Sequence, residues 1–287
     1  MIDKITSMQL IADSGSTKVD WAGIYEDRTV KRLTTEGINP LFQTEDQIVY
    51  SLEKSLLPIF ASRIDKVFFY GAGVLSAEKA QLLERAFLLL FPKAKFFVGS
   101  DMLAAARSLC GNKAGIACIL GTGSNSCFYD GAAIRENIPA GGFILGDEGS
   151  GAVLGRKLIS DWLKKVLPKD VEERVNNRYS LTYKEIVERV YKEPFPNRYL
   201  ASFSPFINEN RRHPYFDKML KGSFREFFAR NIFNYDCRNY AVNFVGSVAF
   251  HFQDFIRDVA QEQNIIVDKI ELSPIDGLID YHKLRML

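Results

Sequence analysis

The sequence predicts an α/β protein made of two domains that repeat one order of elements. Three strands, followed by alternating helices and strands, occupy the chain up to about residue 112, and the same order begins again at Ala114. Each half also places glycines in the turn after its first strand. With 287 residues, 47% of them hydrophobic and 13% aromatic, the chain can bury a sizeable core.

In the first half, short apolar runs that stop at glycine or polar residues predict strands, and apolar residues at helical spacing predict helices. Ser76 has the type and position of a helix N-cap. The expected strands are residues 9–12, 19–25, 29–35, 66–70 and 94–98, and the expected helices are residues 45–60, 76–91 and 102–109.

The second half carries the same signals, interrupted by a segment rich in Pro, Asn and Arg. We interpret this segment, about residues 168–240, as a helical insertion with helices at 181–191 and 224–235. The expected strands are residues 115–120, 126–129, 132–135, 241–245 and 265–270, and the expected helices are residues 150–167, 248–264 and 274–283. The domains are then 1–112 and 113–287, with the option that the last helix packs back on the first domain.

Composition argues against several classes of partner. The chain has 37 basic and 35 acidic residues, a net charge of +2, so no large field favours nucleic acid or an anionic membrane surface. No apolar run approaches a membrane span, and the N-terminus does not resemble a signal peptide, so we expect a cytoplasmic protein. The four cysteines lack C-x-x-C spacing and do not indicate a zinc site or a disulfide framework.

The turn D-S-G-S-T-K at residues 13–18 is the first candidate site. Its hydroxyls and N–H groups can face phosphate oxygens, while Asp13 can order a hydrated magnesium ion. The pattern is not the P-loop, which requires a following helix, because a strand follows here. An ordinary polar hairpin turn remains the alternative.

The second candidate site lies between Cys118 and Gly151. The turn at residues 121–125 reads G-T-G-S-N and can approach a phosphate or a sugar closely. Further on, residues 146–151 read G-D-E-G-S-G and begin a predicted helix. Alternatively, these are glycine-rich turns in which Asp147 and Glu148 only complement the helix dipole.

Asp101 is the third candidate. It follows a predicted strand and opens a predicted helix, so it should lie at the carboxyl end of a sheet, where open α/β sheets bind ligands. A helix-start carboxylate without further function is the alternative. Asn39, in the turn G-I-N-P, is either a turn residue or a polar group that faces a ligand.

Five motifs follow one another along the chain: D-S-G-S-T-K at 13–18, D-M-L-A-A-A-R at 101–107, L-G-T-G-S-N-S at 120–126, G-D-E-G-S-G at 146–151 and V-G-S-V at 245–248. Together they resemble the BadF/BadG/BcrA/BcrD-type ATPase family and, within it, the N-acetylglucosamine kinase-like branch. The family belongs to the superfamily of sugar kinases, heat-shock chaperones and actin. The resemblance implies two ribonuclease-H-like domains with a cleft for ATP and substrate, and a helical insertion in the second.

The resemblance also implies an activity: ATP-dependent phosphorylation of an amino sugar, most closely N-acetylglucosamine, with Mg²⁺, a small-molecule sugar as the partner and a homodimer as an open option. Asp101 would be the catalytic base, and Asp13 would hold the metal through water. Contacts to ATP would come from Asp13, Gly15, Ser16, Thr17, Lys18, Gly121, Thr122, Gly123, Gly246 and Ser247. Contacts to the sugar would come from Asn39, Asp101, Ser124, Asn125, Gly141, Gly142 and Asp147. Phe143 stands near the place of a tryptophan in the animal enzymes.

Two other functions remain open at the level of sequence. An activator ATPase of the same family would need cysteine ligands for an iron-sulfur cluster. The pair Cys110-Gly111 is only a weak match to the Cys-Gly pattern expected of such ligands. A sugar sensor without turnover would not need the carboxylate of Asp101. The missing cysteine-rich zinc motif argues against glucokinases of the repressor-related type.

Overall fold

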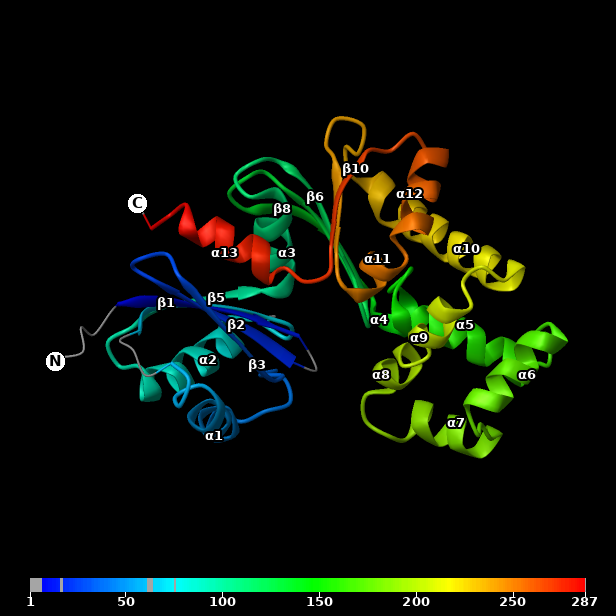
Figure 1. Ribbon diagram of the computed structural model, residues 1–287, viewed down its shortest axis with the longest axis horizontal. Helices are drawn as coiled ribbons and strands as arrows, with labels where there is room; N and C mark the ends of the chain where they lie inside the picture. The colour runs from blue at the N-terminus through cyan, green and yellow to red at the C-terminus, as the bar shows by residue number, and fades with distance from the viewer. Residues whose placement is uncertain (1–6, 16–17, 61–63, 75, 287) are drawn as a thin grey trace. The chain divides into compact units, whose positions relative to one another are not determined.

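The computed structural model describes residues 7–15, 18–60, 64–74 and 76–286 (Figure 1). The chain divides into two compact units. Unit 1 comprises Met1–Asn112 and Ser273–Leu287, and unit 2 comprises Lys113–Leu272. The chain therefore leaves unit 1 after residue 112 and returns to it at residue 273.

Unit 1 contains a five-stranded sheet in the order β3-β2-β1-β4-β5. The first three strands form an antiparallel meander, whereas β4 and β5 run parallel to β1. The strands are β1 (Met8–Ser14), β2 (Lys18–Tyr25), β3 (Val30–Glu36), β4 (Ile64–Gly71) and β5 (Lys95–Ser100).

Helices cover both faces of this sheet (Figure 1). They are α1 (Glu45–Ser55), α2 (Ala77–Leu90), α3 (Asp101–Cys110) and α13 (Ile275–Lys283). Side chains alternate along β1, so Leu10 packs with α1 and α2 whereas Ile11 packs with α3 and α13. Two separate hydrophobic clusters therefore hold unit 1 together. The predicted N-cap Ser76 is confirmed, since its side chain accepts from the Lys79 amide.

Helix α13 is fastened to α3 and the sheet by a buried polar and aromatic cluster. His282 is buried and bonds the Tyr70 hydroxyl at 2.9 Å, and Arg107 donates to the same hydroxyl at 2.7 Å. Burial, with the charges of Arg107 and Arg285 next, lowers the pKa of His282 to about 3, so the ring stays neutral. The C-terminal helix thus completes the core of the first unit.

Unit 2 repeats the sheet of unit 1. Its strand order, β8-β7-β6-β9-β10, has the same topology, with an antiparallel meander followed by two parallel strands. The strands are β6 (Gly115–Leu120), β7 (Ser124–Tyr129), β8 (Ile134–Ile138), β9 (Val242–Val245) and β10 (Val267–Glu271). The α/β class with two similar sheets is confirmed.

Most helices of unit 2 lie between β8 and β9 in the sequence. They are α4 (Gly142–Leu145), α5 (Gly151–Leu163), α6 (Lys169–Arg178), α7 (Tyr183–Tyr191), α8 (Pro196–Ala201), α9 (Ser204–Glu209), α10 (Pro214–Arg230) and the 3-10 turn η1 (Ile232–Asn234). After β9 follow α11 (Ser247–His251) and α12 (Gln253–Glu262). One hydrophobic cluster joins the sheet to α5, α10 and α12.

Two helix predictions in unit 2 were wrong in their extent. The predicted helix 248–264 is two helices, because Phe252 leaves helical geometry (φ −113°, ψ 23°) and is buried in the core. The helix predicted at 224–235 is α10, which begins ten residues earlier at Pro214. There the His213 ring accepts from the Tyr215 amide, and proline suits the first helical position.

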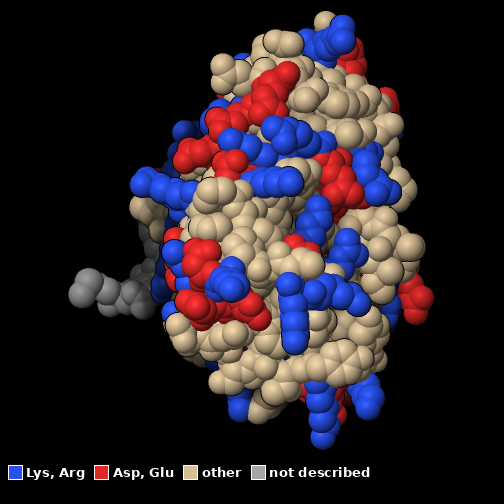
Figure 2. Space-filling view, turned by 90° about the vertical axis from the view of Figure 1, so that its right-hand side faces the viewer, with Lys and Arg blue, Asp and Glu red and all other residues tan. Residues whose placement is uncertain are grey.

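The surface and the helices agree with the charge balance of the sequence. On the face drawn in Figure 2, basic and acidic side chains are interspersed. Within the described ranges, no helix combines the length and the apolar character needed to span a membrane.

Candidate active site

In unit 1, the predicted site residues meet at one edge of the sheet. The parallel register places Ser14 beside Gly71 on β4, and Gly71 beside Ser100 on β5. Asp13 and Asp101, each adjacent to one of these residues in the sequence, therefore stand at the carboxyl ends of β1 and β5. This is the edge where open α/β sheets bind ligands.

Asp13 has two carboxylates in its surroundings. Asp20 lies directly opposite on β2, so the two side chains share one face of the sheet. Burial first, then the charges of Asp20 and Asp101, raise the pKa of Asp13 to about 7. Magnesium prefers such hard oxygen ligands and would relieve their repulsion. The donor set therefore fits a hydrated Mg²⁺, although no three or more described His, Cys, Asp or Glu residues form a metal site by themselves.

Sequence reasoning missed Asp20, although a signal existed. Asp13 and Asp20 are equally far from the centre of the turn, so a tight hairpin must bring them together. Like charges placed directly opposite destabilise a sheet and are therefore informative. Lys18 partly neutralises Asp20, because its Nζ binds Asp20 Oδ2 at 2.7 Å.

The turn that follows Asp13 is only partly described. The Gly15 amide donates to the Lys18 carbonyl at 2.9 Å and closes the hairpin. Ser16 and Thr17, two of the predicted phosphate contacts, lie outside the described residues. The Lys18 ammonium binds the Asp20 carboxylate in this structure. The predicted contact of Lys18 with a phosphate therefore remains a prediction.

Asp101 begins α3, directly after Ser100 at the end of β5. Ser100 caps the helix by accepting from the Leu103 amide at 3.2 Å. Asp101 Oδ1 accepts from the Met102 amide at 2.8 Å, and burial nevertheless raises the pKa of Asp101. A carboxylate whose pKa is moved toward neutrality can accept a proton more effectively.

Asn39 lies at the same edge of the sheet. The Ser14 hydroxyl donates to the Ile38 carbonyl at 2.7 Å, which ties the Asn39 turn to the end of β1. Asn39 is buried against the loop after β4, where a β-carbon on Gly73 would stand 2.3 Å from Asn39 Oδ1. Unit 1 thus brings Asp13, Asn39 and Asp101 to one edge.

In unit 2, the turn of residues 121–123 joins β6 to β7. The first two amides of α5, those of Gly151 and Ala152, donate to Gly121 O at 2.8 Å and to Thr122 O at 3.0 Å. The Gly121 amide donates to Gly123 O at 2.9 Å. Helix α5 therefore fixes the turn in place, as a phosphate-binding loop requires.

Gly246 brings β9 and α11 against this turn. Its φ is +120°, and a β-carbon on it would stand 2.4 Å from the Leu120 carbonyl oxygen. Only glycine permits both the conformation and this approach. Ser247, the next residue, begins α11 beside Gly121.

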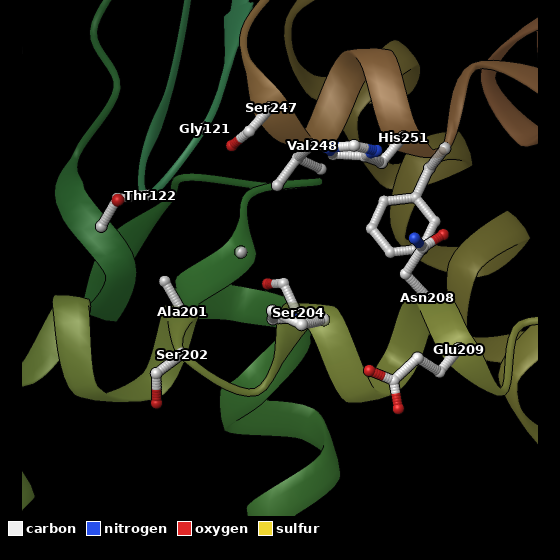
Figure 3. Close-up of a pocket in the computed structure, with 13 residues that line it drawn as sticks. Gly121, Thr122, Ala201, Ser202, Ser204, Asn208, Glu209, Ser247, Val248 and His251 are labelled. Atoms are coloured by element: carbon white, nitrogen blue, oxygen red, sulfur yellow. The ribbon is translucent and has the colours of Figure 1, made fainter.

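A cavity of about 440 Å³ opens in unit 2 beside this turn (Figure 3). Its lining combines predicted residues with residues of α9 and α11 that the sequence did not indicate, because no motif marks them. The predicted ones are Gly121, Thr122 and Ser247, and the others include Ser204, Asn208 and His251.

Asp147 is held in a strained conformation near the same turn. Its φ is +54°, uncommon for a residue other than glycine, and its side chain is buried over Gly123. Asp147 Oδ1 accepts from the Ser124 amide at 3.0 Å, and burial raises the pKa of Asp147. Strain that persists at a buried carboxylate suggests a functional position.

Glu148 does not simply complement the dipole of α5. Arg230 Nε lies 3.0 Å from Glu148 Oε1, and Asn231 Nδ2 donates to Glu148 Oε2 at 3.3 Å. The C-terminal end of α10 thus anchors the buried Glu148 and, through the chain, the neighbouring Asp147.

The remaining predicted sugar contacts, Asn125, Gly141 and Gly142, precede Asp147 in the sequence. Asn125 Oδ1 accepts from the Ser126 amide and from Asn137 Nδ2, both at 2.9 Å. Gly141 and Gly142 are exposed at the start of α4, one short turn before Asp147.

None of the four cysteines forms a disulfide within the part of the chain that the structure describes: Cys118, Cys127 and Cys237 are buried, and Cys110 is half-buried. Cys118 and Cys127 lie in the strands of the second sheet and pack as small apolar residues.

Comparison with known proteins places this geometry among sugar kinases. No family model and no curated protein matches the chain. A crystal structure of a candidate N-acetylglucosamine kinase from Porphyromonas gingivalis matches with a TM-score of 0.93 and 43% identity, over 98% of this chain and 100% of that one.

Two more distant structures share the fold. A candidate N-acetylglucosamine kinase from Chromobacterium violaceum has a TM-score of 0.67 at 15% identity, over 96% of this chain and 98% of that one. A ROK hexokinase from Thermus thermophilus has a TM-score of 0.56 at 12% identity, over 96% of each chain. The predicted two-domain fold of this superfamily is confirmed. Because the similarity to the first structure spans both chains at 43% identity, this protein belongs to the family of the candidate N-acetylglucosamine kinase of Porphyromonas gingivalis.

Proposed function

We propose that this protein is an ATP-dependent kinase that phosphorylates a hydroxyl group of an amino sugar, with N-acetylglucosamine as the substrate. The similarity along the whole chain to a candidate N-acetylglucosamine kinase carries the proposal. The order of the five motifs supports the finer assignment to the BadF/BadG/BcrA/BcrD-type group.

The cavity of unit 2 would take the nucleotide. Gly121, Thr122 and Gly123 form a turn rich in small residues, which suits close contact with phosphates. Gly246 and Ser247 form the adjoining wall, against which the nucleoside would lie. A volume of about 440 Å³ suits a ligand of this class.

Asp101 would act as the general base. It would accept the proton of the sugar hydroxyl as the new oxygen–phosphorus bond forms and the bond to the leaving ADP breaks. The raised pKa of Asp101 supports this role, since a base works best with a pKa near the working pH.

Asp13 would hold the hydrated metal ion, and Asp20 adds charge beside it. Bound Mg²⁺ would offset the charge of the phosphates. The proposed roles of Gly15, Ser16, Thr17 and Lys18 are contacts to phosphate groups of ATP.

The proposed contacts to the sugar carry groups that can hydrogen-bond sugar hydroxyls. The proposed contacts are Asn39 and Asp101 in unit 1, and Ser124, Asn125, Gly141, Gly142 and Asp147 in unit 2. The buried carboxylate of Asp147, the buried amide of Asn39 and the buried hydroxyl of Ser124 suit the recognition of sugar hydroxyls, because each such group left unpaired would cost free energy.

The deciding experiment measures ADP release from Mg-ATP with a panel of N-acetylated hexosamines, free hexosamines and hexoses. We expect N-acetylglucosamine to give the highest kcat/KM, with a phosphorylated sugar identified by mass spectrometry. If no sugar raises ADP release above the rate without sugar, the kinase proposal fails. A cytoplasmic location and a homodimer complete the proposal, and the mass of the protein in solution tests the latter.

A further inference from the structure

Helix α9 forms one wall of the cavity in unit 2 and presents two polar side chains to it. Ser204 and Asn208 are four residues apart, so they lie on one face of the helix, about 6 Å apart along its axis. Both point toward the cavity in Figure 3. The helix therefore offers a pair of polar groups at a fixed spacing.

The hydroxyl of Ser204 lacks a partner. Its Oγ is buried and forms no hydrogen bond with any residue that the structure describes. A buried hydroxyl without a partner can bond an ordered water or a ligand, and Ser204, unlike the other such serine on α10, lines a cavity that can hold one. Ser204 Oγ lies beside Gly151 at the start of α5, where a β-carbon would stand 2.8 Å away.

The amide of Asn208 has a fixed polarity. Arg211 Nη1 donates to Asn208 Oδ1 at 2.7 Å and contacts the Asn208 carbonyl oxygen at 3.4 Å. A guanidinium can only donate, so the atom that faces Arg211 must be Oδ1, and Nδ2 must point the other way. Among the described residues none accepts a hydrogen bond from Nδ2. Asn208 thus offers a donor to the cavity.

The cavity itself has two different ends. Gly121 and Thr122 lie at one end, whereas Asn208 and Glu209 lie at the other (Figure 3). The glycine-containing turn at the first end would accept phosphate groups, whereas the second end carries the Glu209 carboxylate, which is paired with Arg178. A nucleotide would therefore lie with its phosphates at Thr122 and its base at Asn208, which leaves the ribose near Ser204.

We propose that α9 recognises the nucleoside of the phosphoryl donor. Asn208 donates from Nδ2 to an acceptor on the base, such as a purine ring nitrogen, and Ser204 bonds a ribose hydroxyl. Arg211 is a positioning residue, because it fixes which end of the Asn208 amide faces the base. The inference rests on the proposed function, since it takes this cavity as the nucleotide site.

The ribose contact is tested by calorimetric titration of wild type and Ser204→Ala with ADP, 2′-deoxy-ADP and 3′-deoxy-ADP. We expect Ser204→Ala to weaken ADP binding about three- to tenfold, as for one neutral hydrogen bond. One of the two deoxy analogues should bind both proteins equally. An equal loss for all three ligands, or no loss for ADP, overturns this contact.

Ser223→Ala is the matched control. Ser223 Oγ is also buried and without a partner in the described part of the chain, but Ser223 lies on α10 and does not line the cavity. This variant should bind ADP like the wild type. If it weakens ADP as much as Ser204→Ala does, the loss reflects general packing and the ribose contact is refuted.

The base contact is tested with Asn208→Leu and with deaza analogues of ADP, each of which lacks one ring nitrogen. Asn208→Leu should weaken ADP about three- to tenfold, and one analogue should bind wild type and variant alike. Arg211→Met should reduce the discrimination between ADP and that analogue, and Arg211→Lys should restore part of it. If Asn208→Leu affects every ligand equally, the amide does not read the base.

Binding of ADP to the wild type separates the two levels of failure. If the wild type does not bind ADP, the proposed function and this inference both fall. If it binds ADP and the α9 variants are unchanged, only this inference is wrong. Circular dichroism confirms that each variant is folded.

Discussion

The two units share one sheet topology but place opposite chemistry at the same edge. In unit 1 the hairpin after the first strand carries Asp13 and Asp20, and Asp101 follows at the end of β5. In unit 2 the corresponding hairpin has the small turn of residues 121–123, and Gly246 packs against it. The edge in unit 1 concentrates negative charge. The edge in unit 2 presents a backbone turn that a ligand can approach closely.

This difference shows that the fold sets where a site lies, and the residue at the strand end sets what it can do. At each edge the site residues also cost the folded state free energy, and we call this cost the burden of the edge. In unit 1 it is electrostatic, since burial and neighbouring charges raise the pKa of Asp13 to about 7. In unit 2 it is conformational, since Asp147, a residue with a β-carbon, has a φ of +54°, and since the φ of +120° at position 246 restricts that position to glycine. Both kinds of burden are typical of functional sites.

The largest effect is expected from Asp101→Asn. If Asp101 is the base, the amide keeps its shape but cannot take the proton, so kcat should fall by about a hundredfold to ten-thousandfold. ADP affinity should stay within a factor of about two, because Asp101 is proposed to contact the sugar and not the nucleotide. Steady-state kinetics and ADP titration measure the two quantities.

Asp254→Asn is the control for that substitution. Asp254 is also a carboxylate in the first turn of a helix, but it lies on α12, is exposed and does not line the cavity. Its replacement should leave kcat unchanged. Near-normal turnover of the Asp101→Asn variant would show that Asp101 only begins a helix and is not the catalytic base. Asp147 would then be the next candidate for the base.

A glycine pair tests the conformational burden of unit 2. Gly246→Ala places a β-carbon 2.4 Å from the Leu120 carbonyl oxygen at a φ of +120°. We expect ADP affinity to fall at least about tenfold and the free energy of unfolding to fall by about 1–3 kcal/mol. Gly222→Ala, in open space within α10, should instead stabilise the protein by up to about 1 kcal/mol and leave ADP affinity unchanged. Equal behaviour of the two variants would contradict the comparison.

The electrostatic burden of unit 1 predicts that Asp13→Asn stabilises the metal-free protein. The pKa of Asp13 is raised from 3.8 to about 7, so between these pH values the folded state keeps a proton that the unfolded state has lost. The free energy of unfolding therefore falls as pH rises through this window and stays reduced above it. At pH 8 the variant should exceed the wild type by about 1–4 kcal/mol, and the difference should vanish toward pH 4.

Urea unfolding at pH 4, 6 and 8 in the presence of EDTA measures this difference. Added Mg²⁺ should stabilise the wild type more than the variant, because it relieves the repulsion around Asp13. If the variant were less stable than the wild type at pH 8, the Asp13 carboxylate would stabilise the folded state instead of destabilising it.

The smallest effect is expected from Lys18→Met. The charge of Lys18 lowers the pKa of Asp13, so its removal should raise that pKa further. If the ionisation of Asp13, the proposed holder of the metal, sets the acid limb of the pH–activity profile, that limb should move upward by less than about one pH unit, because Lys18 is largely exposed and water screens its charge. Lys95→Met, an exposed lysine at the opposite end of β5, should leave the profile in place. A downward shift for Lys18→Met would contradict the assignment of the limb to Asp13.

Sequence reasoning was strongest where local signals act alone. The Ser76 cap and the order of strands could be predicted, because capping and alternation depend on neighbours in the chain. It failed where burial competes with helix propensity: Phe252 divides one predicted helix because its ring enters the core. Asp20 was within reach of hairpin geometry, whereas Ser204 and Asn208 lie in an insertion without a motif.

The sequence by itself determined the repeated α/β order and the glycine and carboxylate motifs at strand ends, since these follow from periodicity and turn chemistry within short stretches. The tertiary structure decided which distant residues meet. It placed Asp20 opposite Asp13, bound Arg230 to Glu148, and turned α9 toward the loop of residues 121–123. Such contacts join segments separated by tens of residues in the chain. They depend on how the helices bury their apolar faces against the sheet, which no local pattern encodes.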